Sequence, residues 1–480
     1  MNENKDLPEI EDGALAAKTE SAEKPAGDNA NEEQKPAKNK ERRAKLVLKT
    51  VAATAALLVA FFSGIAVNYF SNGKEYRTLS FILDTFRKQY YEYDEDQSIP
   101  DALVGALMDR YSEYYTAEEY KRRLSEGNGE REGFGIALSG LTVYRVGGNS
   151  PAEQSGIKQG GVITGFKKAG DGQFVNAESG EALTEFLSGV SANEQVVLRI
   201  LYGTEEKEHI VTKRAYRETY VYYEDLTGKY RYSDDDGKKK NISLERYGDC
   251  SDIFSDEWGY IQYTSFYGLL DGTEGSVGQF TGALDLFLEN GRKNLIVDLR
   301  NNGGGYLSIM QRLSGILCRD LPDSAKKEYG GKGCQHAVSR YGTQVYDIDG
   351  KYSSSKNGQK YSARIEKIVF LANSGSASAS EALIGAVLDY DFYSGSNAVR
   401  VIVESVNENG KEVFRTYGKG IMQSTFTNFA TGEALKLTTA KLYWPLSGKT
   451  IHGKGITPDT DERVLPSDGA PVKMAQNLAF

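Results

Sequence analysis

Residues Lys367–Tyr390 read KIVFLANSGSASASEALIGAVLDY and combine an apolar run, a serine-rich turn and a helical pattern. The apolar run ends at Ala372 and is typical of a buried strand, while the helical pattern begins near Ser380. Between them, Ser376, Ser378 and Ser380 alternate with small residues. The stretch therefore predicts a strand–turn–helix unit with three serines at the turn.

This turn has two interpretations. Small neighbours leave a serine nucleophile uncrowded, and the N-terminus of a helix favours the negative charge that develops during attack. However, Ser378 and Glu381 also have the spacing of a capping box, in which the serine only closes the helix end. Taken alone, the stretch favours a capping serine over a catalytic one.

A second block, Asn294–Gly305, reads NLIVDLRNNGGG and precedes a helical pattern. It predicts a buried strand that turns sharply into a helix. The turn lacks the GK[ST] ending of a P-loop and the spacing of a dinucleotide fingerprint, which argues against nucleotide binding. The same backbone can instead offer N–H groups to an oxyanion.

A third block, Thr416–Gln423, reads TYGKGIMQ and places Lys419 between two glycines. Glycines allow close backbone approach and can hold the lysine at a fixed point. A lysine acts as a general base only where burial lowers its pKa toward the working pH. The alternative interpretation is an exposed lysine in a turn.

The composition limits the classes of function. A chain of 480 residues predicts about three structural units. The net charge of -9 argues against nucleic-acid binding. The cysteines show neither a zinc pattern nor a disulfide framework, although a Cys250–Cys334 or Cys318–Cys334 bridge is left open beside free thiols. With three histidines, His209, His336 and His452, the chain offers few candidates for a histidine-based mechanism.

The N-terminal region has the pattern of a membrane anchor. The uncharged stretch Thr50–Phe70 would span roughly 31 Å as a helix, enough to cross a bilayer. The basic run KNKERRAK before it predicts a cytoplasmic N-terminus and an extracytoplasmic remainder. A cleaved signal peptide is disfavoured because 49 residues precede the apolar run. We expect residues 1–44 to be disordered and residues 45–72 to form the anchor.

The rest of the chain divides into regions that differ in their pattern of apolar, charged and glycine residues. Residues 75–128 show helical spacing, with a capping box at Thr116 and Glu119. Residues 131–215 contain short β-rich runs with glycine turns, and residues 216–256 contain the charged run SDDDGKKKN and are interpreted as a connector. Residues 257–480 carry the three blocks described above.

The β-rich region resembles a PDZ domain. The run GFGIAL is followed by SPAEQSGIKQGGVI, the order in which such domains place their carboxylate-binding loop, helix and turn. Gly161 stands where these domains usually have an aspartate. The resemblance implies that the N–H groups of a loop formed by Gly133, Phe134, Gly135 and Ile136 cap a peptide's C-terminal carboxylate while the peptide adds as a strand.

The order NNGGG, SASASE and GKG after a PDZ-like unit resembles the C-terminal processing (tail-specific) peptidases. The resemblance extends from about Glu75 to the C-terminus and includes HGKGITPD at residues 452–459. It implies that Ser378 is the nucleophile, Lys419 its base and Gln423 the residue that orients the lysine. The implied oxyanion donors are the backbone N–H groups of Ala379 and Gly305.

The resulting expectation is a multidomain α/β protein: a transmembrane helix, a helical unit, a PDZ-like β domain and a mixed α/β Ser–Lys peptidase core. It would be a serine endopeptidase without cofactor or metal, anchored in the plasma membrane through residues 50–70. Its partners would be polypeptides with accessible C-termini, with no nucleic acid and with a homo-oligomer left open. The alternatives are a silent scaffold that binds tails, and an esterase or acyltransferase that uses the same dyad. A long insertion between Ser378 and Lys419 predicts an added hairpin.

Overall fold

The computed structural model describes residues 59, 63, 73–89, 98–227, 230–233, 239–242, 254–273, 275–458, 463–464, 471–478 and 480. The chain divides into two compact units, residues 1–97 and residues 98–480, and each is described by itself. The predicted tail and all but two residues of the predicted anchor lie outside the described residues. Among the residues described, no helix has the length and apolar character of a membrane span. In the first unit, α2 (Gly73–Gln89) is helical where the apolar spacing predicts it.

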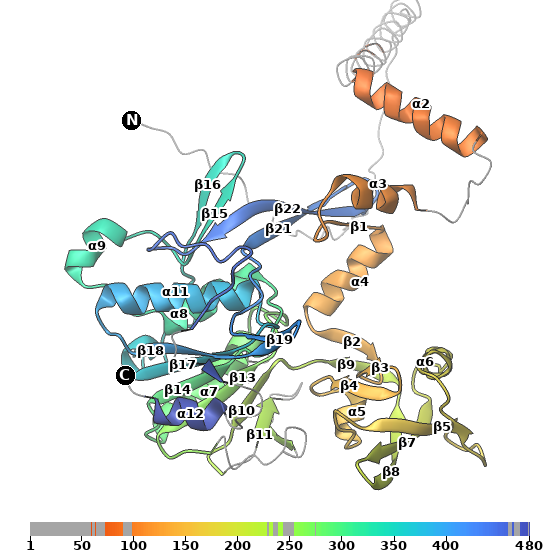
Figure 1. Ribbon diagram of the computed structural model, residues 1–480, viewed down its shortest axis with the longest axis horizontal. Coiled ribbons are helices and arrows are strands. Elements are labelled where there is room, and N and C mark those ends of the chain that lie inside the picture. The colour runs from red at the N-terminus through yellow and green to blue at the C-terminus, as the bar shows by residue number, and fades with distance from the viewer. Residues whose placement is uncertain are drawn as a thin grey trace, which may run out of the picture. The chain divides into compact units, whose positions relative to one another are not determined.

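The second unit is built around an eight-stranded mixed sheet with the order β12-β11-β10-β13-β14-β17-β18-β23 (Figure 1). Strands β13, β14, β17, β18 and β23 run parallel to one another, and β10, β11 and β12 continue the sheet with antiparallel pairing. The strands are β10 (Val221–Glu224), β11 (Tyr230–Ser233), β12 (Lys239–Ile242), β13 (Trp258–Tyr263), β14 (Asn294–Asp298), β17 (Lys367–Ala372), β18 (Val399–Glu404) and β23 (Arg463–Val464). Crossovers between parallel strands carry α7 (Ser276–Glu289), α8 (Leu307–Leu317), α9 (Asp323–Tyr329), α10 (Tyr361–Arg364) and α11 (Ala379–Ser394).

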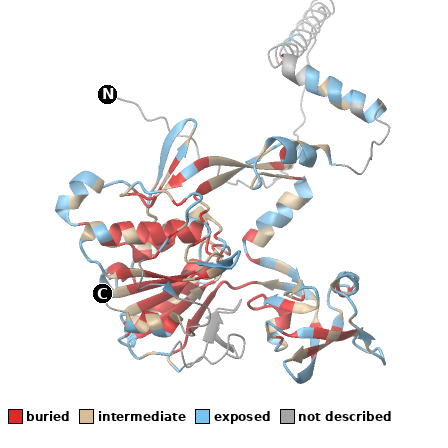
Figure 2. Cartoon of the chain, in the orientation of Figure 1, coloured by how far each residue is buried: buried red, intermediate tan, exposed pale blue. Residues whose placement is uncertain are grey.

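Both faces of this sheet are buried. Side chains alternate along a strand, so Leu295 and Val297 face a core shared with α7, α8 and α11. The residue between them, Ile296, packs with Val369 and with α12 (Pro471–Asn477) on the other face. Burial on two sides explains why the predicted strands read as continuous apolar runs. Figure 2 shows the buried residues concentrated in this sheet and in α11.

The region that we predicted to be a connector, residues 216–256, is different in the structure. Val221 of β10 pairs with Tyr263 of β13, and all four residues of β10 are buried. Strands β11 and β12 extend the same sheet from β10. The charged run SDDDGKKKN dominated the sequence pattern, whereas β10 is short and rich in tyrosine, which made its burial hard to predict.

A second sheet has the order β1-β22-β15-β16, and β21 pairs with the opposite edge of β22. Its strands are β1 (Glu113–Tyr115), β15 (Gln335–Ser339), β16 (Gly342–Tyr346), β21 (Ile421–Thr427) and β22 (Ala434–Tyr443). β1 lies between α3 (Ile99–Leu107) and α4 (Ala117–Gly127), so a region expected to be purely helical also contributes a strand. The capping box predicted at the start of α4 is present, with Thr116 N–H donating to Glu119 Oε2 at 2.9 Å.

The β-rich region forms a six-stranded sheet of its own, ordered β3-β4-β5-β7-β8 with β6 paired to β5. Its elements are β3 (Ile136–Ser139), β4 (Thr142–Val146), α5 (Pro151–Gln154), β5 (Val162–Lys168), β6 (Val175–Asn176), α6 (Gly180–Ser188), β7 (Gln195–Tyr202) and β8 (Glu205–Thr212). The chain enters through β2 (Glu130–Gly133) and leaves through β9 (Arg214–Arg217), which pair with each other. β3 is therefore an edge strand of a compact module whose two connections lie side by side.

The insertion between Ser378 and Lys419 contains the predicted hairpin, formed by β19 (Val406–Glu408) and β20 (Lys411–Val413). Asn409 and Gly410 both have positive φ, as a tight hairpin turn requires. The earlier part of the insertion is β18, a strand of the central sheet. Cys318 and Cys334 are buried free thiols, and Cys250 lies outside the described residues.

Candidate active site

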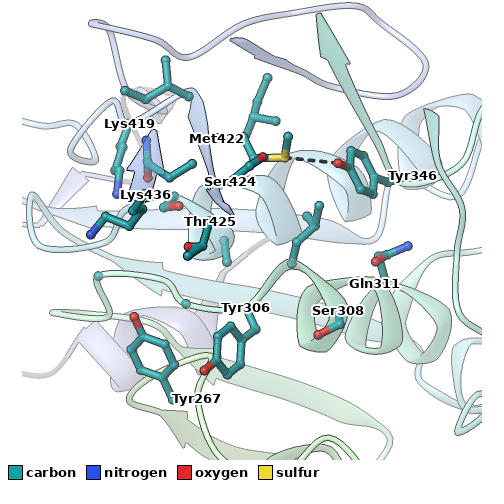
Figure 3. A pocket seen from close by; sticks show the side chains of 18 residues that line it. Tyr267, Tyr306, Ser308, Gln311, Tyr346, Lys419, Met422, Ser424, Thr425 and Lys436 are labelled. Atoms are coloured by element: carbon teal, nitrogen blue, oxygen red, sulfur yellow. Dashed lines mark hydrogen bonds between the residues drawn. The ribbon is translucent and has the colours of Figure 1, made fainter. Parts of the chain in front are cut away.

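A cavity of about 540 Å³ brings the three sequence blocks together. Figure 3 shows Lys419, Ser424 and Thr425 on one side of this cavity and Tyr267 and Tyr306 on another. The residues that line it from the three blocks are Gly303, Gly305, Ser378, Ala379, Lys419, Ile421, Met422 and Gln423. Segments that are far apart in the sequence thus form one concave site of the size that suits a ligand.

Ser378 occupies the turn between β17 and α11 in a strained conformation. Its φ of 58° and ψ of -115° fall in a region that L-residues rarely adopt. The N–H of the preceding residue, Ala377, donates to Asn302 O at 2.9 Å and anchors the turn. Such strain persists only where the surroundings impose it, and it is concentrated at functional sites.

The other two serines of the turn have structural roles. Ser376 and Ser380 are fully buried, and neither lines the cavity. The Ser376 hydroxyl donates to Leu299 O at 2.8 Å, and the Ser380 hydroxyl donates to Asn302 O at 2.9 Å. Both bonds tie the serine turn to the end of β14 and the loop that follows it. Of the three alternating serines, Ser378 is the one that faces the cavity.

The glycine loop after β14 lies directly against the serine turn. A Cβ atom at Gly304 would lie 2.7 Å from Ala377 O and 2.8 Å from Ala379 N, so a side chain there would force the two loops apart. Phe266 bonds to the residues on both sides of Gly305, because its N–H donates to Gly304 O and its carbonyl accepts from Tyr306 N–H. The N–H of Gly305 therefore points away from Phe266, as alternate groups of a paired strand do.

Glu381 connects the serine turn to the loop that carries Lys419, residues 414–420 between β20 and β21, which we call the lysine loop. Its carboxylate accepts from the backbone N–H groups of Ser378 (3.0 Å), Gly418 (2.8 Å) and Lys419 (2.9 Å), and from the hydroxyl of Thr416 (2.5 Å). The residue is fully buried, and burial raises its pKa, whereas the four donors act in the opposite direction. A buried carboxylate with four donors therefore fixes the position of the serine turn relative to the lysine loop.

The C-terminal motif at residues 452–459 is hydrogen-bonded to the lysine loop. Gly453 N–H donates to Gly418 O at 2.9 Å, and Ile456 N–H donates to Thr416 Oγ1 at 2.7 Å. His452 is exposed and lines no part of the cavity. The motif therefore shapes the lysine loop through its backbone.

Lys419 is half-buried in the cavity wall. Burial lowers its pKa, and the positive charge of Lys436 acts in the same direction. The Nζ atom lies 4.9 Å from the centre of the Tyr111 ring. Within the described residues, no hydrogen bond joins Lys419 Nζ to Ser378 Oγ. The structure thus places the two side chains in one cavity without bonding them to each other.

Gln423 also lines the cavity, but the structure gives it a different contact from the one expected. Its side-chain nitrogen donates to Thr438 Oγ1 at 3.2 Å, across a β-bulge in the pairing of β21 with β22. No hydrogen bond to Lys419 is found among the described residues. The side chain that contacts the lysine amine is instead that of Tyr111.

The loop Gly133–Ile136 lies in the separate β module and not in the catalytic cavity. Phe134 is buried in the module's core, and its carbonyl accepts from Ala152 N–H at 2.9 Å. The carbonyl of Gly135 accepts from Gly147 N–H at 2.8 Å. Ile136 begins β3, the edge strand, so the loop stands at the end of a strand that has one side open to pairing.

Sequence reasoning missed three side chains of the site. Glu381 was interpreted only through its capping spacing, although its other partners come from the lysine loop. Tyr111 and Lys436 reach the site through the pairing of β1 with β22. A strand of three residues leaves too short a pattern in the sequence to indicate this pairing.

The comparisons with known proteins agree with this geometry. Residues 257–394, which include Ser378, match the profile of peptidase family S41. A "Probable CtpA-like serine protease" of Staphylococcus haemolyticus is 27% identical over 427 residues, which cover 86% of this chain and 71% of the relative. A protein of the same description from Staphylococcus aureus (strain N315) is 29% identical over 384 residues, covering 78% and 61%.

Among solved structures, a photosystem II D1 C-terminal processing protease is 19% identical with a TM-score of 0.41, and the alignment covers 79% of this chain and 85% of that chain. The sequence comparisons and the cavity define a serine peptidase with a mixed α/β core. Within that class, the chain is similar to peptidase family S41, whose profile matches residues 257–394, and to CtpA-like serine proteases along most of its length.

Replacing Glu381 by glutamine should impair cleavage strongly. The amide keeps the shape but presents an NH₂ group to donors that need an acceptor. The loss of one charge-assisted hydrogen bond, about 1.5–3 kcal/mol, corresponds to a fall in kcat/KM of about 10- to 150-fold. The measurement is the cleavage rate of an unfolded protein substrate, with circular dichroism to confirm folding. As a control, Glu408→Gln changes an exposed carboxylate of the β19–β20 hairpin and should leave the rate unchanged. Equal rates for both variants would contradict the connecting role of Glu381.

Proposed function

We propose that Ser378 is the nucleophile of a serine endopeptidase and that Lys419 is its general base. The observation that carries this proposal is the cavity in which a strained serine at a helix N-terminus and a half-buried lysine are joined through Glu381. Both residues have the environment that their roles need: Ser378 lines the cavity beside a positive helix end, and burial lowers the pKa of the Lys419 amine.

In the proposed reaction, the neutral Lys419 amine takes the proton of Ser378 Oγ as that oxygen attacks a peptide carbonyl. The carbonyl oxygen becomes an oxyanion between the backbone N–H groups of Ala379, at the first turn of α11, and Gly305, which points away from Phe266. The lysine then gives its proton to the leaving amine, and a water molecule hydrolyses the acyl-enzyme by the same route in reverse. Lys419 must first turn from Tyr111 toward Ser378.

We also propose that the β module is a PDZ domain that engages the C-terminal tails of substrates. The support is the position of the loop Gly133–Ile136 at the end of the edge strand β3. An extended peptide could add along β3 while the loop's N–H groups meet its carboxylate. The paired connections β2 and β9 lead directly along the chain to α4 and to β10, and β10 is a strand of the central sheet.

The proposal for location rests on the sequence. The apolar stretch 50–70 and the basic run before it suit a single-pass anchor in the plasma membrane with a cytoplasmic N-terminus. The catalytic part would then act on extracytoplasmic polypeptides.

Removing the proposed nucleophile should abolish activity without unfolding the protein. Ser378→Ala should reduce cleavage of an unfolded protein with an apolar C-terminus to background, and Lys419→Ala should do nearly the same because an unactivated serine is a poor nucleophile. Ser308→Ala is the matched control, since Ser308 is an exposed serine that lines the same cavity from α8.

Full activity of Ser378→Ala would show that the nucleophile is a different residue. No activity in the folded wild-type protein, together with binding of peptide tails, would instead favour a scaffold that binds without cleaving.

The PDZ proposal predicts discrimination between free and blocked C-termini. A substrate that ends in a free carboxylate should be cleaved with a higher kcat/KM than the same substrate with a C-terminal amide, because the amide removes the anion that the loop binds. A shift of about tenfold corresponds to about 1.4 kcal/mol of lost binding free energy. Equal kcat/KM values for the two substrates would exclude recognition of the carboxylate.

A further inference from the structure

Lys419 is held by an aromatic ring from a distant part of the chain. Its Nζ atom lies 4.9 Å from the ring centre of Tyr111, within the range of a cation–π contact. Tyr111 belongs to the short turn between α3 and β1, whereas Lys419 precedes β21. The ring therefore reaches the proposed base from a segment that is far from it in the sequence and outside the three blocks that form the cavity.

The turn that carries Tyr111 is well defined. Asp109 Oδ1 accepts from Tyr111 N–H at 3.0 Å and from the Ser112 hydroxyl at 3.0 Å, which closes the turn on itself. The next residue, Glu113, pairs in register with Lys436 of β22. The position of the ring is thus set by a local turn and by the pairing of β1 with the sheet of the site.

The phenol group fixes the orientation of the ring. Arg110 Nη2 donates to Tyr111 Oη at 2.7 Å and to Tyr417 Oη at 3.1 Å. Tyr417 lies two residues before Lys419, so the ring is bonded at its outer edge to the loop that carries the lysine. The ring contacts two cations, since Arg110 Cζ and Lys419 Nζ each lie 4.9 Å from its centre, and Arg110 is the one that is also hydrogen-bonded to the phenol oxygen.

The charged and titratable groups around Lys419 come from several elements. Lys436 of β22 opposes its positive charge, while Asp109, Glu381 and Tyr111 favour it. Lys436 is itself bonded to Glu113 Oε2 at 2.6 Å. Among these groups, Tyr111 contacts the nitrogen of Lys419 itself, and a neutral aromatic face attracts an ammonium far more strongly than an amine.

We propose that Tyr111 is a positioning residue for Lys419, which holds the protonated side chain in a resting position and releases the neutral amine toward Ser378. The role of the released amine rests on the proposed function above. The consequence is a selection by protonation state, since the charged lysine is attracted to the ring and the uncharged lysine is free to accept the serine proton. Deprotonation and engagement with the nucleophile thereby become one event.

The test is a series of phenylalanine analogues at position 111 in the full chain. Tyr111→Phe keeps the ring and serves as the reference, and 4-fluoro- and 3,4,5-trifluorophenylalanine then weaken the negative face with little change in shape. Weakening the contact removes a preference for the ammonium, so the pH at which Lys419 is half-titrated should fall along the series, by about half a unit to one unit in total. Trifluorophenylalanine at Tyr267, which lines the cavity, is the matched control and should cause no shift.

Two readouts separate this inference from the proposed function. Trace acetylation with acetic anhydride, quantified on the Lys419 peptide by mass spectrometry in the Ser378→Ala protein, reports the titration of the lysine without any need for activity. The acid limb of kcat/KM in the active protein should move to lower pH by the same amount. No movement of the Lys419 titration along the series, or the same movement with the Tyr267 control, would overturn the inference. If the Lys419 titration shifts along the series but the wild-type protein cleaves no substrate, the positioning by Tyr111 is supported and the proposed peptidase function is refuted.

Discussion

The buried carboxylate of Glu381 is the contact on which the geometry of the site depends. It joins the serine turn to the lysine loop through backbone donors on both, and it does so from the first turn of α11. An isolated carboxylate in such a place is costly, so its four donors must remain aligned for the fold to keep it. The need to satisfy this buried carboxylate therefore holds together two loops that come from different sheets: the serine turn after β17 of the central sheet, and the lysine loop between β20 and β21.

The central sheet supplies the rigid frame for this contact. β14 and β17 are neighbours, and each ends in one of the loops that meet at Ser378: the glycine loop after β14 and the serine turn after β17. Parallel strands bring their carboxyl ends to one edge of the sheet, where ligand sites of α/β proteins form. The second sheet then lines the cavity, because β21 carries Gln423 and β22 carries Lys436, while the turn before β1 brings Tyr111 to Lys419. The site is thus assembled from two sheets and from a segment of the N-terminal region.

The central strands and the serine turn could be predicted because they leave strong local patterns. Lys367–Ala372 is an uninterrupted apolar run, and the capping spacing at Thr116 is read directly from the sequence. The contacts of the site could not be predicted in the same way. Gln423 lines the cavity with Lys419 and is bonded to Thr438, so its orienting role stays a prediction, and the three residues of β1 gave no signal that Tyr111 would contact the lysine. Strand β10 was missed for a similar reason, since its burial depends on pairing with a strand that lies beyond a long charged segment.

The central claim is that Ser378 is a nucleophile activated by Lys419, and the most direct measurement is the reaction of the purified protein with a serine-directed fluorophosphonate. Peptide mapping identifies the modified residue, and the rate is followed as the pH is raised. The account predicts modification at Ser378, at a rate that rises as Lys419 loses its proton below the ordinary pKa of a lysine and that collapses in Lys419→Met. Modification of a different serine, or the same rate in Lys419→Met, would contradict it.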